Sequence, residues 1–270
     1  MDSKKLGEAF LIDWSETKAA IWRPKHAALR AAKRLDGIRL NQLLQIDRQK
    51  QRLIDNTERF LAGLPANHAL LWGAKGTGKS SLIKALLNEY AHSGLRVIEV
   101  DKSDLIDLPE IVDHIDSEPY RFIIFCDDLS FEAEETSYKH MKSILEGSIE
   151  LPPDNILLYA TSNRRHLVPQ SQYDNQETLA ARMADAHVLY SDTVEEKLSL
   201  ADRFGLWLSF YPISWQEYQH VVESLFEGQA LDYNREQLMA DAQLFARSRG
   251  TNSARTAKQF YQSVIKNREN

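Results

Sequence analysis

The residues best suited to chemistry lie in the stretch 73–81, which reads GAKGTGKSS. It fits the pattern G-x-x-x-x-G-K-[ST], with an apolar run before it and the helical pattern SLIKALLNEYA after it. Glycines let such a loop curl so that its N–H groups point inward, and the amino terminus of the next helix adds partial positive charge. The pattern predicts a phosphate-binding loop, with an ordinary strand-turn-helix as the alternative. The predicted binding residues are Gly73, Ala74, Lys75, Gly76, Thr77, Gly78, Lys79, Ser80 and Ser81.

Two side chains of this loop have specific expected roles. Lys79 would bridge the β- and γ-phosphates of a nucleotide, and the Ser80 hydroxyl would be a ligand of Mg²⁺. The loop therefore predicts a site for a nucleoside triphosphate with its magnesium ion.

Two adjacent aspartates, Asp127 and Asp128, follow the apolar run FIIFC. Triphosphate chemistry needs a carboxylate at a strand end to hold the metal ion and a second group to orient the attacking water. We expect Asp127 to hold Mg²⁺ and Asp128 to orient water, although either could instead cap the next segment. Asp128 is shorter than a glutamate by one carbon–carbon bond, about 1.5 Å, so either the loop brings it closer or a bridging water spans the gap.

Short apolar runs separated by longer segments predict the element that positions these residues. The runs are ALLW at 69–72, LRVIEV at 95–100, FIIFC at 122–126, NILLYA at 155–160 and LWLSFY at 206–211. Because they are apolar on both faces, and because the intervening segments are long enough for crossovers, we expect a parallel sheet covered by helices.

Helical spacing appears on both sides of this region. Residues 44–62 have apolar side chains at helical intervals, and Pro65 ends the pattern. After Pro212, three further segments repeat the same spacing up to about residue 264. We expect residues 213–270 to form a small helical subdomain.

The 270 residues carry a net charge of −6, but residues 1–60 hold 13 Lys and Arg against 8 Asp and Glu. We interpret residues 1–43 as a basic helical arm, which is either a solvated helix such as KHAALRAAKRL or a surface for nucleic acid or an acidic partner. No apolar run approaches the length of a membrane span, and the start has no apolar export segment, so we expect a cytoplasmic protein with no membrane contact. The single cysteine, Cys126, is expected in the core.

Three later motifs follow the loop and the acidic strand in a fixed order. They are TSNRR with Asn163, LADRFG with Arg203, and RGTNSARTAKQF with Arg255. In this order they resemble the AAA+ ATPases, and together with NTERFLAGLPANHALLWGAKGTGKSSLIKALL they resemble most closely a bacterial family of predicted AAA+ ATPases, domain of unknown function 815. Most AAA+ motors have glutamate where this chain has Asp128, although the closer family carries paired aspartates.

The resemblance implies an α/β fold of the P-loop type, with a five-stranded parallel sheet, a C-terminal helical lid and often a ring with ATP at subunit boundaries. Asn163 would help to polarise the water. Arg203 would act as an arginine finger in the neighbouring subunit's site, and Arg255 would report the γ-phosphate to the lid. The alternative is turn capping for Asn163, and a surface or structural ion pair for each arginine.

These features divide the chain into an arm at 1–43, a nucleotide-binding domain at 44–212 and a lid at 213–270. The leading hypothesis is an ATP hydrolase that uses Mg²⁺ and drives a conformational change on an unidentified protein or nucleic-acid partner. A slow nucleotide-dependent switch or loader that docks to a partner is the alternative, and a DNA-associated module that uses the basic arm is a third. The chain has no N-K-x-D motif for guanine, and the preference for ATP comes from the resemblance.

Overall fold

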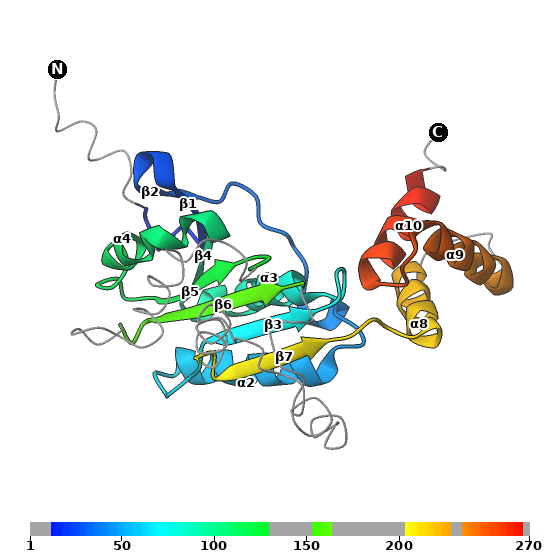
Figure 1. Ribbon diagram of the computed structural model, residues 1–270, viewed down its shortest axis with the longest axis horizontal. Helices are drawn as coiled ribbons and strands as arrows, with labels where there is room; N and C mark the ends of the chain where they lie inside the picture. The colour runs from blue at the N-terminus through cyan, green and yellow to red at the C-terminus, as the bar shows by residue number, and fades with distance from the viewer. Residues whose placement is uncertain (1–11, 130–152, 164–202, 228–233, 267–270) are drawn as a thin grey trace, which may run out of the picture.

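The computed structural model describes residues 12–129, 153–163, 203–227 and 234–266. Their strands form one sheet in the order β2-β1-β4-β5-β6-β3-β7 (Figure 1). The strands are β1 (Ala19–Arg23), β2 (Ala28–Ala31), β3 (Ala69–Gly73), β4 (Leu95–Val100), β5 (Arg121–Cys126), β6 (Ile156–Ser162) and β7 (Leu206–Phe210). The α-helices are α2 (Asp47–Leu61), α3 (Lys79–Tyr90), α4 (Leu108–Asp113), α8 (Trp215–Phe226), α9 (Arg235–Arg249) and α10 (Ala254–Lys266). Short 3-10 helices are η2 (Pro24–His26), η3 (Leu40–Gln42), η4 (Ala91–Ser93) and η5 (Lys102–Asp107).

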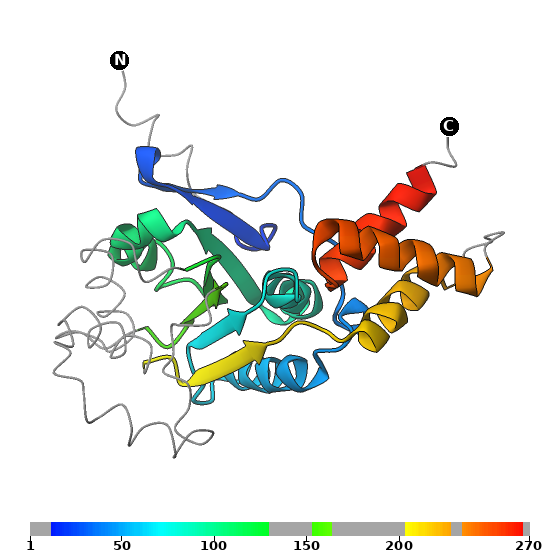
Figure 2. The ribbon, with the colours of Figure 1, turned by 45° about the vertical axis from the view of Figure 1, so that its right-hand side comes forward.

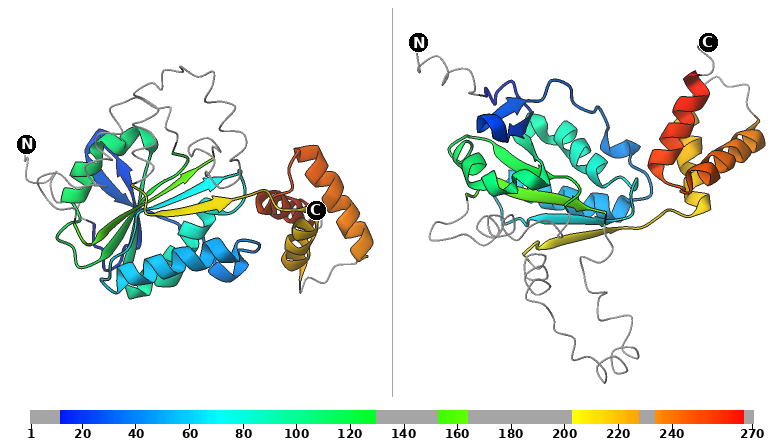
Figure 3. Two further views of the ribbon diagram at one scale, coloured as in Figure 1. Left: turned by 60° about the horizontal axis from the view of Figure 1, so that its bottom comes forward. Right: turned by 45° about the horizontal axis from the view of Figure 1, so that its top comes forward.

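All five predicted apolar runs are strands, and all five pair in parallel. Alternate side chains of each strand enter opposite apolar layers, as Leu70 and Leu71 do in β3. One layer packs against α4 and η5, and the other packs against α2 and α3. Figure 3 shows helices on either side of the sheet. Burial of both faces explains why the runs are continuous rather than alternating.

The prediction of five strands was wrong, because the described sheet has seven. The two additional strands, β1 and β2, form an antiparallel hairpin in the region interpreted as a helical arm, and β1 pairs in parallel with β4. Trp22 and Leu29 are buried in the layer that contains α4. The extended form thus buries two apolar side chains and pairs the open edge of β4, which outweighs the helix propensity of KHAALRAAKRL.

The C-terminal helices pack on one another around their own apolar cluster, which includes Tyr218, Ala242 and Phe260. The sequence sets their ends. Ser214 and Glu217 form a capping box at the start of α8, and Gly250 adopts a left-handed conformation at the end of α9. Figures 1 and 2 show these helices beside the carboxyl ends of the strands rather than on a face of the sheet. In the described part of the chain, no helix is both long and apolar enough to span a membrane.

His68, just before β3, bonds to both of the strands that flank β3, β6 and β7. Its Nδ1 accepts the backbone N–H of Leu158, at 2.9 Å, and its carbonyl oxygen accepts the N–H of Leu206, at 3.1 Å. Burial lowers the pKa of His68 to about 4, because a charged imidazole would lose hydration and could not accept the Leu158 bond. The folded state therefore requires neutral His68.

We expect this requirement to make stability depend on pH. The pKa of His68 is lower in the folded state than in the unfolded state. The contribution of neutral His68 to the free energy of unfolding is therefore complete above about pH 6.5 and is lost as the pH falls toward 4. Between about pH 7.5 and about pH 5, the loss should reach about 2 kcal/mol in the free energy of unfolding. Urea unfolding should show it in the wild type and much less of it in His68→Gln. The exposed His92, changed to Gln, is the control, and equal pH dependence in wild type and His68→Gln would contradict the assignment.

Candidate functional site

The loop between β3 and α3 curls tightly around the end of a lysine side chain. Gly73 has a φ of +132°, and a Cβ on it would lie 1.9 Å from the carbonyl oxygen of Phe210, so only glycine fits beside β7. The backbone N–H of Ala74 donates to that same carbonyl at 3.0 Å, and the Thr77 hydroxyl donates to the carbonyl of Ala74 at 2.8 Å. These contacts fix the loop against the ends of two strands.

Lys79 is buried at the first position of α3. Its Nζ donates to the carbonyl oxygens of Gly73 and Ala74, at 3.0 and 2.7 Å, and to Oδ1 of Asn163, at 3.0 Å. Burial lowers the pKa of the Lys79 ammonium to about 8, against the opposing attraction of Asp127 and Asp128. The loop therefore places one cation where a phosphate group could replace part of its hydrogen bonding.

Asp127 lies next to Ser80, directly after β5. The Ser80 hydroxyl donates to Oδ1 of Asp127 at 2.7 Å, and the Thr161 hydroxyl donates to the same oxygen at 2.5 Å. Thr161 is buried in β6, the strand beside β5, so the register of these two strands sets the position of the carboxylate. The two predicted metal-binding side chains are thus in contact.

Asp128 adopts a left-handed backbone conformation, with a φ of +55°. Its N–H donates to the Thr161 hydroxyl at 3.0 Å, and its Oδ1 accepts the side-chain N–H of Asn163 at 2.6 Å. Asn163 therefore connects Lys79 on one side with Asp128 on the other. The two acids therefore have different side-chain partners, because Ser80 and Thr161 donate to Asp127 and Asn163 donates to Asp128.

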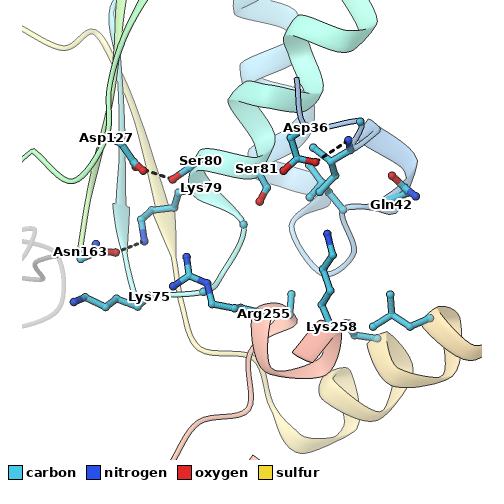
Figure 4. A pocket seen from close by; sticks show the side chains of 18 of the residues that line it. Asp36, Gln42, Lys75, Lys79, Ser80, Ser81, Asp127, Asn163, Arg255 and Lys258 are labelled. Atoms are coloured by element: carbon cyan, nitrogen blue, oxygen red, sulfur yellow. Dashed lines mark hydrogen bonds between the residues drawn. The ribbon is translucent and has the colours of Figure 1, made fainter. Parts of the chain in front are cut away.

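A cavity of about 690 Å³ opens in front of these groups. Figure 4 shows Lys79 from α3 and Arg255 and Lys258 from α10 pointing into it. The backbone N–H of Arg255 also donates to the carbonyl of Gly76, at 3.4 Å, so α10 touches the loop itself. The cavity is lined by Asp36, Gly37, Ile38, Gln42, Leu43, Lys75, Gly76, Gly78, Lys79, Ser80, Ser81, Asp127, Asp128, Asn163, Val221, Leu225, Ala254, Arg255 and Lys258.

The structure brings most of the predicted site residues together and separates a few. Gly73, Ala74 and Thr77 do not line this cavity but shape the loop behind it. Arg203 lies just before β7, at the amino end of that strand. Since Phe210 of the same strand contacts the loop, a strand rise of about 3.3 Å per residue places Leu206 roughly 13 Å from the loop, and Arg203 lies three residues before Leu206.

The sequence reasoning missed the segment 36–43, which forms one wall of the cavity. Asn88 of α3 holds it in place by donating to the carbonyl oxygens of Asp36 and Ile38, at 2.7 and 2.8 Å. No motif marks this segment, because its anchors are backbone carbonyls. Thr161 was missed as an aspartate-positioning residue, although it stands two positions before Asn163. Lys258 was also missed, and its spacing of three from Arg255 on a helix was the available signal.

A family model described as a protein of unknown function, DUF815, matches residues 15–268. The chain belongs to the DUF815 family. Over 68 residues the chain is also 37% identical to the large subunit of replication factor C from Ignicoccus hospitalis. That match covers 24% of this chain and 14% of the relative.

Two solved structures share the overall fold. Orc1 of Aeropyrum pernix, solved in complex with DNA, has a TM-score of 0.56 and 17% identity, over 86% of this chain and 65% of that one. A RuvB mutant of Thermotoga maritima has a TM-score of 0.51 and 14% identity, over 83% of this chain and 65% of that one. Both are AAA+ ATPases, and at these identities the likeness shows the AAA+ fold. The chain spans 65% of each of these two proteins and a smaller part of replication factor C.

The contact between the loop and α10 can be tested at Gly76. A Cβ there would lie 2.7 Å from Oγ of Ser253 and 3.3 Å from Cβ of Arg255. We expect Gly76→Ala to push the loop and α10 apart and to weaken binding of a non-hydrolysable ATP analogue by about tenfold, or about 1.4 kcal/mol. Isothermal titration calorimetry measures this affinity.

Gly94→Ala is the matched control. Gly94 has a φ of +92°, close to the +79° of Gly76, but a Cβ on it would meet nothing within 4 Å. Both variants carry a left-handed alanine, at a cost of about 1 kcal/mol, and only Gly76→Ala adds the clash. Equal affinities in the two variants would show that the contact with α10 does not shape the site.

Proposed function

We propose that this protein binds Mg²⁺-ATP and hydrolyses its γ-phosphate to drive a conformational change on a macromolecular partner. The observation that carries the proposal is the convergence of Lys79, Ser80, Asp127, Asp128 and Arg255 on one cavity. A cavity of about 690 Å³ lies within the roughly 300–1,000 Å³ range of small-ligand sites.

The triphosphate would lie along the loop, where backbone N–H groups and the amino terminus of α3 favour an anion. Lys75, Lys79, Arg255 and Lys258 supply four cationic side chains to the cavity. Asp36, Asp127 and Asp128 supply three acidic ones. Since the cations come from both the loop and α10, the phosphates would draw these two elements together.

Ser80 and Asp127 fit a magnesium ion. Both present oxygen ligands, which Mg²⁺ prefers, and their contact of 2.7 Å places those oxygens together at the edge of the cavity. When bound, the ion would neutralise charge on the β- and γ-phosphate oxygens. Thr161 would keep the Asp127 carboxylate oriented for this role, because it holds the same oxygen.

Asp128 and Asn163 are the proposed pair for the attacking water. Asp128 would accept a hydrogen bond from the water, and Asn163 would hold the aspartate and polarise the water, because its amide already donates to that carboxylate. The hydrogen bond between them fixes the direction of a side chain that is short for this task.

Segment 36–43 and the helices of residues 213–270 would enclose the rest of the nucleotide. Val221 and Leu225 of α8 offer an apolar surface, and the anchored backbone at Asp36 and Ile38 stands opposite. We propose that residues 213–270 act as a lid on the domain that contains the sheet, with Arg255 as the residue that reports the γ-phosphate.

A slow switch or loader is the second candidate. The short Asp128 side chain, held by Asn163, favours it because a poorly placed water would slow hydrolysis without weakening binding. Such a protein would act on its partner while ATP is bound.

Arg203 is proposed to act in a neighbouring subunit of a homo-oligomeric ring. Its position at the amino end of β7 separates it from its own loop. An arginine supplied from a neighbour can stabilise charge on the transferring phosphoryl group, with effects of about 10³–10⁵ in rate in other phosphoryl-transfer systems.

Lys79→Ala tests the proposed hydrolysis. The variant should lose nearly all MgATP turnover, because among the residues that the structure describes only Lys79 donates its ammonium group to the loop carbonyls of Gly73 and Ala74. A coupled phosphate-release assay measures this. Lys84→Ala changes an exposed lysine of the same helix and should keep the wild-type rate.

Hydrolysis by Lys79→Ala at the wild-type rate would refute the proposal. The same assay separates the two candidates through the wild-type rate. A steady-state rate below about one event per minute without a partner, together with tight nucleotide binding in a single-turnover experiment, would identify the protein as a switch. Each tenfold decrease in rate corresponds to about 1.4 kcal/mol of activation barrier.

Arg203→Ala tests the action across a subunit boundary. We expect turnover to fall by at least about 10³-fold while the affinity for an ATP analogue stays within about twofold. Mixing Arg203→Ala subunits with Lys79→Ala subunits should restore activity, because some sites then combine an intact loop with a neighbour's arginine.

Arg48→Ala, which removes an exposed arginine, is the control and should change neither quantity. Failure of mixed subunits to regain any turnover, with a confirmed oligomer by mass measurement, would place Arg203 outside catalysis.

A further inference from the structure

The hairpin of β1 and β2, with the residues that flank it, carries a concentrated positive charge. Residues 18–35 contain six Lys and Arg and no Asp or Glu. The remaining chain holds 27 Lys and Arg against 39 Asp and Glu, a net charge of −12. We call residues 18–35 the basic hairpin. A cationic element of this kind on an otherwise acidic protein favours binding of a polyanion.

Most of these cations are available to a partner. Lys18, Arg23, Lys25, Lys33 and Arg34 are exposed, and the structure gives none of them a side-chain hydrogen bond or ion pair with the other described residues. Arg30 differs, because it is half-buried and donates to the carbonyl of Ala31. Five charges therefore face solvent from a stretch of chain with no neutralising acid of its own.

The basic hairpin is a fixed part of the sheet and not a loose tail. Trp22 is buried between β1 and η5, and its Nε1 donates to the Asp107 carboxylate at 2.8 Å. Leu29 of β2 is buried in the same apolar layer. Because its backbone is fixed by pairing on both sides of β1, the cations lose little backbone freedom on binding.

The chain that follows the basic hairpin leads to the nucleotide site. β1 runs parallel to β4, so Arg23 and Lys25 follow the carboxyl end of β1, as the phosphate loop follows that of β3. The chain after β2 continues directly into segment 36–43, which lines the nucleotide cavity. Figure 1 shows this connection running from β2 toward the C-terminal helices.

We infer that the basic hairpin binds the phosphodiester backbone of a nucleic acid. A nucleic-acid strand carries one negative charge per about 3.4 Å, so it can meet several exposed cations at once. An acidic protein surface fits less well, because protein interfaces depend on buried aromatic or aliphatic anchors and the tip offers only Pro24, Lys25, His26 and Ala27. A membrane surface also fits less well, since the tip has no large apolar side chain to insert.

The test compares two triple variants of the full chain with equal charge changes. One is Arg23→Gln, Lys25→Gln and Lys33→Gln in the basic hairpin. The control is Arg48→Gln, Lys84→Gln and Arg247→Gln, three exposed cations outside it. Fluorescence anisotropy measures binding to labelled single-stranded DNA, duplex DNA and RNA of about 30 nucleotides, between about 50 and 200 mM salt.

We expect the hairpin variant to bind at least about tenfold more weakly and to reduce the slope of log K against log salt by about 2 to 3, since each phosphate contact contributes about 0.7 to 0.9. The control should stay within about twofold of wild type. Comparison of the affinities for DNA and for RNA shows which nucleic-acid backbone is preferred.

Three results would overturn the inference: no nucleic-acid binding at about 50 mM salt, equal losses in both triple variants, or binding to vesicles with anionic lipid but not to nucleic acid. If the triple variant fails to fold by circular dichroism, Lys25→Gln alone, at the exposed tip, should still lower the slope by about 1. MgATP turnover without nucleic acid should be the same in all folded variants. Absence of hydrolysis in the wild type would therefore count against the proposed enzyme, whereas a loss of DNA or RNA binding in the hairpin variant, with hydrolysis unchanged, would count for the basic hairpin.

Discussion

The candidate site depends on one buried ammonium group. Lys79 Nζ is held by two carbonyl oxygens of its own loop and by the amide oxygen of Asn163. Burying a cation is costly unless hydrogen bonds replace its hydration, and here they come from residues at the ends of β3 and β6. The loop can close around Lys79 only because Gly73 allows close approach to β7. The position of the Lys79 ammonium group thus depends on how the ends of β3, β6 and β7 are aligned in the sheet.

The acids follow from the same arrangement of strand ends. β5 and β6 are neighbours, so Asp127, Asp128 and Thr161 meet where those strands end. Thr161 contacts both aspartates, through the carboxylate of one and the backbone N–H of the other. The left-handed backbone of Asp128 then directs its carboxylate to Asn163. Two chemically identical residues thus have different hydrogen-bond partners, Ser80 and Thr161 for the Asp127 carboxylate and Asn163 for the Asp128 carboxylate.

The elements with strong local patterns could be predicted from the sequence. β3 to β7 were visible because burial on both faces leaves continuous apolar runs, and the loop between β3 and α3 was visible because its glycines and lysine follow a pattern of fixed spacing. The hairpin was missed because alanine, leucine, lysine and arginine favour a helix locally, whereas pairing with β4 is a contact between distant parts of the chain. Segment 36–43 was missed because Asn88 binds its carbonyl oxygens, which every residue type carries. The distance between Arg203 and the loop could not be predicted, because it depends on which strand lies beside β3 and the motif around Arg203 does not determine that.

The chain from β1 to η3 contains two structural parts, which one short connection links. Its first part completes the sheet beside β4 and presents the basic hairpin, and its last part forms a wall of the nucleotide cavity. Asn88 and the buried Leu43 hold that wall on the side of α3, the helix that begins with Lys79. A nucleotide that tightens this wall would restrict the connection that leads back to β2, and a polyanion bound at the basic hairpin would restrict it from the other end. By thermodynamic reciprocity, the factor by which nucleotide changes the affinity of the basic hairpin for a polyanion must equal the factor by which that polyanion changes the affinity for nucleotide.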